Sequence, residues 1–259
     1  MANKLKNILL GLIPFATLLT IWQISDYFAW LPKWLVPSPY KVMLAGWQLI
    51  SDGSLLGLIT TSALNAIPAF IIAVVSALIV GTMIGLNETI RKILQPLLSA
   101  IYPIPSLAWL PFIILFFGFT REAIWIIVFI SSFLKMIYNV IGGVRGVEKN
   151  WILAAKNLGL SRISIIFKII LPGALPQIMT GLRMGWGSSW KSLIGAEMLL
   201  STLGGLGRFI WAAQWYFSFD KLIVGIMAIA LIGLLMEQLV FRRLERLTLM
   251  RWGLIKDDD

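Results

Sequence analysis

Residues 148–172 read EKNWILAAKNLGLSRISIIFKIILP and form the longest polar and basic interval between the apolar runs of this chain. The basic side chains in it are those of Lys149, Lys156, Arg162 and Lys168. Ala154 and Ala155 precede Gly159, and an Ile-x-Leu-Pro sequence that ends at Pro172 closes the segment. A plain solvated loop does not need this order. The pattern therefore predicts a helical hairpin outside the bilayer that a second protein grips.

The composition of the whole chain is that of an integral membrane protein. Of its 259 residues, 59% are hydrophobic and 13% are charged, and the mean hydropathy is +0.88. A soluble domain contains about 25% charged residues on average. The 12 tryptophans and 5 tyrosines suit the aromatic belts at membrane interfaces. Basic cytoplasmic loops explain the net charge of +10 more simply than nucleic acid, which we do not expect as a partner.

Six apolar runs are long enough to cross a bilayer, which takes about 20 residues per helix. They cover residues 8–30, 61–86, 94–118, 123–144, 174–199 and 222–244. The runs are continuous and lack the alternation over about ten residues that marks outer-membrane strands, so helices are predicted. We therefore expect an all-α membrane protein with one transmembrane domain over residues 1–259 and no cleavable signal peptide.

The basic residues predict which side of the membrane each loop faces, because cytoplasmic loops are enriched in Lys and Arg. With the N-terminus inside, the cytoplasmic cations are Lys4, Lys6, Arg91, Lys92, Arg145, Lys149, Lys156, Arg162, Lys168, Arg242, Arg243, Arg246, Arg251 and Lys256. The outer cations are the smaller set Lys33, Lys41, Arg121, Arg208 and Lys221. This excess inside predicts that both chain ends and the loop 145–172 are cytoplasmic.

Two outer segments are expected to contain short helices. In residues 33–52, the pattern Val42-x-x-Ala45-x-x-Gln48-Leu49 indicates an amphipathic helix on the membrane surface, with a packed loop as the alternative. In residues 201–220, a glycine turn precedes an aromatic helix. That helix either dips back and closes an outer gate or serves as an interfacial anchor. The gate residues expected in it are Trp211, Trp215 and Tyr216.

The third predicted span is rich in proline. It contains Pro96, Pro103, Pro105 and Pro111. Proline lacks a backbone donor and kinks a helix, and in lipid the freed carbonyls need a neighbouring helix or a wet cavity. We therefore expect this span to be bent and buried in the bundle. Two interpretations remain open, a lining of a translocation path and a kink that serves packing.

The most informative charged residues lie within the fourth and fifth predicted spans, where charge is costly and marks a partner or a wet cavity. Arg183, Trp190 and Glu197 share one helical stripe because they are seven residues apart, and Lys191 lies about 80° away. The stripe forms either structural ion pairs, with Glu197 paired to Arg208, or a path for a small anion. The candidate path residues are Lys135, Arg183, Trp190, Lys191 and Glu197. The alternative for Lys135 is packing against a carbonyl.

The sequence contains no catalytic or metal-binding pattern. It has no Cys or His, which excludes thiol chemistry and the usual zinc and haem ligands. It has no G-x-x-x-x-G-K-[ST] phosphate loop, so this chain does not bind ATP by that mechanism. Paired carboxylates occur only in Asp257–Asp259, which we interpret as a solvated tail. We predict no catalytic residue, no metal ligand and no cofactor bound by this chain.

The segment 148–172 resembles the EAA loop of bacterial ABC importer permeases, whose pattern is EAA, three residues, Gly, nine residues and I-x-L-P. The matching positions are Ala154, Ala155, Gly159, Ile169, Leu171 and Pro172, whereas Leu153 stands where the family has Glu. VPSP at 36–39, YPIPSLAWLPFIILFFG at 102–118 and GLRMGWGSSWKSLIGAEML at 181–199 extend the resemblance over most of the chain. They are similar to the nitrate, sulfonate and taurine type of permease.

This resemblance implies the six-helix type I importer permease fold (MetI-like), with cytoplasmic N- and C-termini, in the bacterial inner membrane. It also implies a second permease copy, expected to form a homodimer, two cytoplasmic ATPase subunits that bind ATP and Mg, and an extracytoplasmic substrate-binding protein. The residues expected to couple to the ATPase, from a helix near 151–158, are Trp151, Ala154, Ala155, Gly159, Leu160 and Pro172. The cargo expected from Lys135 and Lys191 is a small anion such as a sulfonate, nitrate or bicarbonate.

Two other classes of protein remain as alternatives. An ion-gradient-driven secondary transporter is disfavoured because no carboxylate is placed at mid-membrane and no inverted repeat is evident. A non-transporting scaffold would use its basic loop only to bind anionic lipid. Co-purification of an ATPase subunit bound to the loop separates the importer from both.

Overall fold

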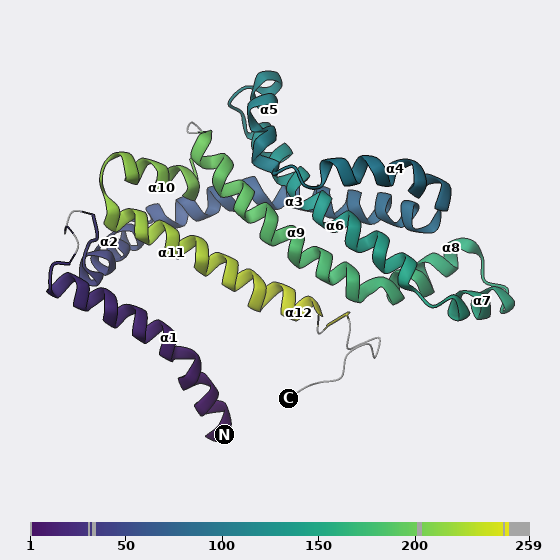
Figure 1. Cartoon of the computed structure of the whole chain (residues 1–259), viewed down its shortest axis with the longest axis horizontal. Helices are drawn as coiled ribbons and strands as arrows, with labels where there is room; N and C mark the ends of the chain where they lie inside the picture. The colour runs from purple at the N-terminus through teal and green to yellow at the C-terminus, as the bar shows by residue number, and fades with distance from the viewer. Residues whose placement is uncertain (1, 31, 33–34, 201–203, 246, 249–259) are drawn as a thin grey trace.

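The computed structural model describes residues 2–30, 32, 35–200, 204–245 and 247–248, and every regular element in these ranges is helical (Figure 1). The α-helices of the first half are α1 (Ala2–Tyr27), α2 (Pro39–Ser51), α3 (Ser54–Leu86), α4 (Glu88–Ile101), α5 (Leu110–Phe117) and α6 (Arg121–Gly146). Those of the second half are α7 (Lys149–Asn157), α8 (Arg162–Ile165), α9 (Leu171–Leu199), α10 (Leu206–Trp215), α11 (Phe219–Leu235) and α12 (Arg242–Glu245). A 3₁₀-helix, η1 (Ser106–Trp109), and two π-helices, η2 (Ile166–Ile170) and η3 (Met236–Phe241), join some of them.

Some residues used in the sequence predictions lie outside the described residues. They are the tail Asp257–Asp259, the cations Lys33, Arg246, Arg251 and Lys256, and residues 201–203 at the start of the second outer segment.

Four helices of the described part are long and apolar enough to cross a membrane. They are α3, α6, the continuous run Arg162–Leu199 that ends with α9, and the run Phe219–Glu245 that begins with α11. The pair formed by α4 and the η1–α5 segment raises the number to five if it is one broken span. Helix α1 occupies most of the first predicted span but is not one of these five. The described residues thus contain four or five candidate spans, and six remains a prediction.

The third predicted span, residues 94–118, is two helical segments instead of one. Helix α4 ends at Ile101, η1 begins at Ser106, and the two segments meet at 87°. Pro103 and Pro105 lie in the break, where they cannot donate a backbone hydrogen bond. The predicted bend is therefore confirmed.

The predicted burial of this span is wrong for α4. Every residue of α4, all of which the structure describes, is at least partly exposed. Its first two turns are polar, with Glu88, Arg91, Lys92 and Gln95, and only one apolar side, which includes Leu94 and Leu98, packs on the core. An amphipathic helix of this kind covers the bundle from outside.

The core is built on α6, which packs against both α3 and α9. Glycines on the neighbouring helices allow close approach to it. A Cβ atom at Gly81 or Gly85 of α3 would lie within 2.8 Å of Val140 or Val144, and one at Gly181 of α9 would lie 2.8 Å from Asn139. Small residues permit such contacts between membrane helices. Gly81, Gly85 and Gly181 therefore allow close helix packing within the chain.

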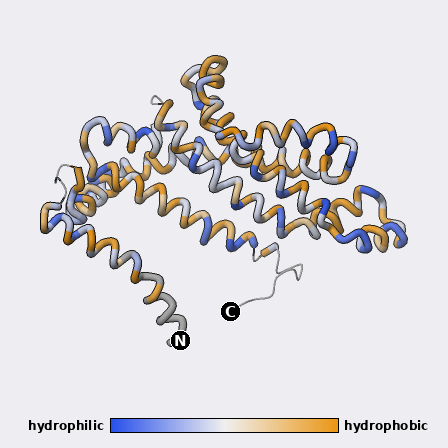
Figure 2. Tube along the Cα trace, in the orientation of Figure 1, coloured by the Kyte–Doolittle hydropathy of each residue, from blue (hydrophilic) through white to orange (hydrophobic). Residues whose placement is uncertain are grey.

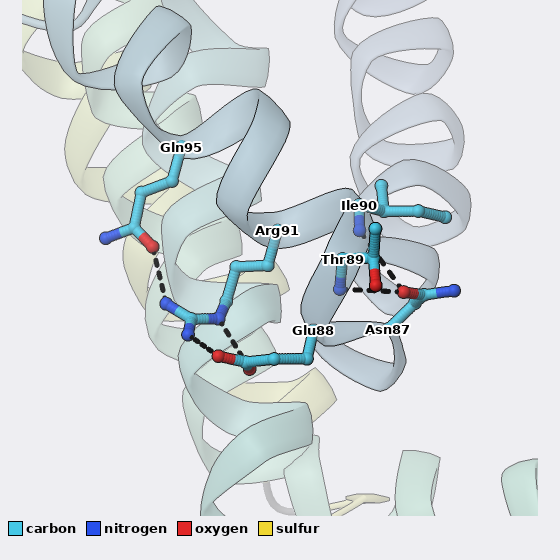
Figure 3. A network of polar contacts seen from close by, with 6 residues as sticks. All are labelled: Asn87, Glu88, Thr89, Ile90, Arg91 and Gln95. Atoms are coloured by element: carbon cyan, nitrogen blue, oxygen red, sulfur yellow. Dashed lines mark hydrogen bonds and ion pairs between the residues drawn. The ribbon is translucent and has the colours of Figure 1, made fainter.

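The turn between α3 and α4 is held by side-chain hydrogen bonds (Figure 3). Asn87 caps α4, because its Oδ1 accepts from the amides of Thr89 and Ile90 at 2.9 and 3.2 Å. Arg91 pairs with Glu88 and donates from Nη1 to Oε1 of Gln95 at 2.6 Å. The polar start of α4 is thus a capped and internally paired surface helix.

Short helices lie at both ends of the long axis of the bundle (Figure 1). Helices α2 and α10 lie at one end, whereas the α7–α8 hairpin and the α3–α4 turn lie at the other. The hairpin is hydrophilic, while the long helices between the two ends are mainly hydrophobic (Figure 2). Helix α2 is the amphipathic helix predicted in the first outer loop, and it packs through Val42, Ala45 and Leu49 against Val224 of α11. Two helices from predicted outer segments, α2 and α10, therefore lie opposite two predicted cytoplasmic segments, the α3–α4 turn and the α7–α8 hairpin.

Candidate functional site

The segment 148–172 forms the predicted helical hairpin. Helix α7 ends in a turn in which Gly159 has a φ of +75°, the left-handed conformation that favours glycine, as predicted. The amide of Leu160 donates to the carbonyl of Ala155 at 3.1 Å across this turn. Ser161 then begins α8 and accepts from the amide of Ser164 at 3.3 Å. The conformation of Gly159 and these two local hydrogen bonds thus stabilise the turn between α7 and α8.

The two faces of α7 have different surroundings. Ala155 is buried in a cluster with Val144, Val147 and Ile165, so this face joins the hairpin to the bundle. Leu153, on the opposite side, is 54% exposed, and Trp151 and Leu158, which flank Ala155 at i−4 and i+3, are 48% and 80% exposed. Exposed apolar side chains at a hydrophilic end of the molecule are typical of a surface that binds another protein.

The predicted coupling residues therefore divide into two groups. Ala154 and Gly159 are exposed with Trp151, whereas Ala155 lies beneath them in the hairpin's own core. Pro172 lies in the first turn of α9. The family glutamate, replaced here by Leu153, would stand on the exposed face. A charge placed at Ala155 would disturb the hairpin itself before it disturbed any docking.

A cavity of about 340 Å³, with both polar and apolar lining residues, lies where the third predicted span breaks. The break at 102–107 forms one wall, and α6 and α9 form the others. Lys135 of α6 and Lys191 of α9 both line the cavity, so the structure brings together two of the five predicted path residues. The phenol oxygen of Tyr102 accepts from Nζ of Lys135 at 3.1 Å, and this Nζ lies 4.2 Å from the ring centre. The group that contacts Lys135 is thus the side chain of a tyrosine, and not the carbonyl group that was the alternative in the sequence analysis.

Four serines in the cavity wall form a chain of hydroxyl groups. The Oγ–Oγ distances are 2.7 Å from Ser106 to Ser192, 2.9 Å from Ser192 to Ser131 and 2.7 Å from Ser131 to Ser188. The chain links η1, α9 and α6. Four hydroxyl hydrogens serve three internal bonds, so one hydrogen remains to be donated to a bound group. With the two ammonium groups, this wall can bind a small anion.

The stripe Arg183–Trp190–Glu197 does not line this cavity. Arg183 faces the C-terminal helices, where its Nε lies 3.3 Å from Glu237 and its Nη2 lies 2.5 Å from Glu245. Trp190 is buried, stacks on Trp186 and donates from Nε1 to the carbonyl of Ile229 at 3.3 Å. Both residues are thus engaged by neighbours in the same chain. Their place in a path is not supported by these contacts, because the stripe turns toward α11.

Glu197 also differs from its predicted pairing. Its side chain is fully buried and accepts hydrogen bonds from Ser62, Asn65 and the amide of Gly207 at 2.8, 3.0 and 3.0 Å. Within the part of the chain that the structure describes, no ion pair joins it to Arg208, which is exposed. The expected pair with Arg208 is therefore wrong, because polar neutral groups on α3 and α10 occupy the carboxylate.

The predicted aromatic helix is present as α10, which packs on α9 and α11. Trp211 is partly buried and lies edge-on to Trp215 at 6.1 Å, while Trp215 and Tyr216 are 67% and 80% exposed. An outer gate and an interfacial anchor both stay predictions for the function of these three side chains.

Sequence reasoning missed the serine chain and the partners of Glu197. Single serines are frequent in membrane helices, and Ser106, Ser131 and Ser192 are far apart in the chain. The available signal was the spacing of Ser188 and Ser192 at i and i+4, beside Lys191, which places all three on one face of a helix.

Known proteins match this chain over most of its length. The family model of the binding-protein-dependent transport system inner membrane component matches residues 73–246. The taurine transport system permease protein TauC of Escherichia coli (strain K12) is 33% identical over 93% of this chain and 89% of its own length. The bicarbonate transport system permease protein CmpB of Synechococcus elongatus is 32% identical over 92% and 88%. The putative aliphatic sulfonates transport permease protein SsuC of Bacillus subtilis is 31% identical over 93% and 87%.

The fold also matches that of a solved transporter. A chain of the MetNI methionine ABC transporter, in an inward-facing conformation, superimposes with a TM-score of 0.62 at 16% identity, over 75% of this chain and 95% of that one. This likeness shows that the two chains share a fold. The family match covers well over half of the chain, and the relatives exceed 30% identity. The chain therefore belongs to the binding-protein-dependent transport system inner membrane component family and is a multi-pass ABC permease of the inner membrane.

Proposed function

We propose that this permease conducts a small anion past the cavity at 102–107 and that the α7–α8 hairpin couples this step to ATPase subunits. One observation carries the proposal, namely that the hairpin and the cavity share the same two helices. The hairpin connects α6 to α9, and side chains of α6 and α9 line the cavity. A force applied to α7 therefore reaches the cavity wall without passing through any other helix.

The packing of the hairpin supports this transmission. Ala155 and Ile165 belong to one buried cluster with Val144 of α6 and Ala174 of α9. When two ATPase subunits close on ATP and Mg, we expect their hairpins to move together and tilt α6 and α9. The cavity would then open outward, and hydrolysis would reset it. This is alternating access by rigid-body motion.

The lining of the cavity supports an anion as cargo. Two ammonium groups and a serine chain with a spare hydrogen all donate, and carboxylates are not among the cavity's lining residues. Sulfonates, nitrate and bicarbonate all offer oxygen acceptors, and relatives of this chain are named for taurine, aliphatic sulfonates and bicarbonate. A separate binding protein would deliver the anion, and a second copy of this chain would complete the path as a homodimer.

The cavity is tested by changing Lys191 to Ala in a transporter reconstituted with its ATPase and binding protein. Uptake of taurine, nitrate and bicarbonate is measured separately in proteoliposomes. We expect the uptake of the transported anion to fall about tenfold, since one lost charge-assisted contact has a free energy of about 1.5 kcal/mol. The control is Lys221→Ala, which removes an exposed cation on α11 outside the cavity. Uptake by K191A equal to uptake by K221A would refute the anion path.

The coupling hairpin has a separate test. Gly159→Asp places a charged side chain on the exposed turn, at a φ that side chains rarely adopt. We expect the ATPase subunits to hydrolyse ATP without uptake, or to fail to co-purify. Normal uptake with normal ATPase assembly would exclude the hairpin as the docking element, whatever the result for Lys191. A permease that transports without any ATPase would instead favour an ion-gradient-driven transporter.

A further inference from the structure

Glu197 lies at the end of α9 that is remote from the hairpin, fully buried among three helices. Its Oε2 accepts from the hydroxyl of Ser62 and the amide of Gly207, and its Oε1 accepts from Nδ2 of Asn65. Ser62 and Asn65 belong to α3, and Gly207 lies in the first turn of α10. One carboxylate thus binds α3 and α10 to α9 at a single point.

Ser62 strengthens the connection between these helices. Its Oγ accepts from the amide of Leu206 at 2.9 Å, so its own hydrogen is free to be donated to Glu197. The first two amides of α10 are therefore both held, one by the carboxylate directly and one through Ser62. Amides in the first turn have no partner within their own helix, and a negative charge there is favourable.

The backbone at the start of α10 is shaped to fit this carboxylate. Gly205 has a φ of +96°, and a Cβ atom there would lie 2.4 Å from the Glu197 carboxyl carbon. A Cβ atom at Gly207 would lie 2.3 Å from the carbonyl oxygen of Ile194 on α9. A side chain would not fit at either position, so both positions need glycine. Helix α10 therefore begins in direct backbone contact with α9. Within the described residues, Glu197 forms no ion pair, and its polar contacts are those to α3 and α10.

We propose that Glu197 is a positioning residue that fixes α10 to α9 and α3, so that α10 follows this end of α9 as one rigid body during transport. The tilting of α9 rests on the proposed function above. The contacts to Glu197 and the backbone approach at Gly207 make the α9–α10 junction stiff, whereas the far end of α10 presents exposed aromatic side chains. A movement started at the hairpin would in this way displace the outer aromatic helix directly.

The test measures the distance between α9 and α10 in the whole transporter. The chain has no cysteine, so spin labels can be placed at Thr180→Cys on α9 and Gln214→Cys on α10, two exposed positions. One labelled permease is assembled with one unlabelled copy, the ATPase subunits and the binding protein. The distance distribution is recorded by pulsed electron paramagnetic resonance without nucleotide and in an ATP-trapped state.

In the permease that keeps Glu197, we expect one narrow distribution of the distance between the two labels, and we expect it to be the same in both nucleotide states. Glu197→Gln removes the negative charge and one of the two acceptor oxygens, so the distribution should broaden and shift between states, and uptake per ATP hydrolysed should fall about tenfold. Arg208→Ala, a charge change one residue from the anchor, should behave like the parent. If E197Q fails to assemble, Ser62→Ala is measured instead, with the same broadening expected. A parent-like narrow distance in the variant measured would overturn the proposal.

A second label pair separates this inference from the proposed function. Labels at Leu199, exposed on α9, in both copies report whether this end of α9 moves with nucleotide. An unchanged Leu199 distance in the parent would count against the coupled tilt of α9. Whether Glu197 fixes α10 to α9 would still be decided by the width of the α9–α10 distance distribution in E197Q.

Discussion

Helix α9 carries polar side chains on two neighbouring faces, and only one of these faces is closed by partners within the chain. On the closed face, Arg183 meets two glutamates and Glu197 meets α3 and α10. On the open face, Lys191 lines a cavity together with Ser188 and Ser192. Lys191 lies about 80° around the helix from Arg183, and Ser188 and Ser192 lie still farther round.

This difference shows that a charge within a membrane helix does not by itself indicate a path. Burying a charge in a membrane is costly, so each one needs a partner or water. Arg183 and Glu197 have partners and hold helices together. Lys191 is exposed to the cavity instead, and a mobile anion is a suitable partner for it. Changes on the closed face should therefore have the larger effect on stability, and changes on the open face should reduce transport with a smaller loss of stability.

The largest effect on stability is expected for Gly207→Ala at the closed face. The new Cβ would lie 2.3 Å from the carbonyl oxygen of Ile194 and 2.7 Å from Cβ of Glu197, so α10 must move away from α9. Overpacking against backbone costs about 3 kcal/mol. Thermal denaturation of the purified permease should show a clearly lower midpoint. Gly233→Ala on α11 is the matched control, because nothing lies within 4 Å of its Cβ position, and an unchanged midpoint for G207A would contradict the close contact.

A smaller effect is expected for Arg183→Gln, which leaves Glu237 and Glu245 without their cation. The Arg183 side chain is 33% exposed, so solvent screens the pair and the loss should be about 1–2 kcal/mol, below that of a fully buried pair. The same denaturation experiment measures it, with Arg243→Gln on the exposed side of α12 as the control. Adding Glu245→Gln to R183Q should recover part of the loss. Additive losses would mean that the two side chains do not interact.

The sequence was sufficient to predict the elements whose signals are local. Long apolar runs predicted the spanning helices, Gly159 predicted the hairpin turn, and the prolines at 103 and 105 predicted the bend. The position of α4 was not predictable from hydropathy. The run 94–118 is apolar on average, but its first part belongs to a helix that begins at Glu88 with five polar residues in its first eight.

The site was only partly predictable, because its contacts join distant parts of the chain. Lys135 and Lys191 stand out as charges in apolar runs, and both line the cavity. The partner of Glu197 was predicted as Arg208, the next cation along the chain after it, whereas Ser62 and Asn65 lie more than 130 residues away. Neutral polar side chains give no hydropathy signal strong enough to mark them. Only the packing of α3 against α9 identifies these partners.

The smallest effect, and the finest test of the open face, is expected for Ser192→Ala. Ser192 is an inner member of the hydroxyl chain and bonds to both Ser106 and Ser131, whereas Ser188 is an end member of the chain and bonds to Ser131. Losing Ser192 should cost about 1 kcal/mol of stability and lower anion uptake several-fold, since one neutral hydrogen bond is of that size. Ser188→Ala is the matched control and should reduce uptake less. If S188A reduces uptake as much as S192A while K191A has no effect, the serines act as packing residues and the open face is not an anion path.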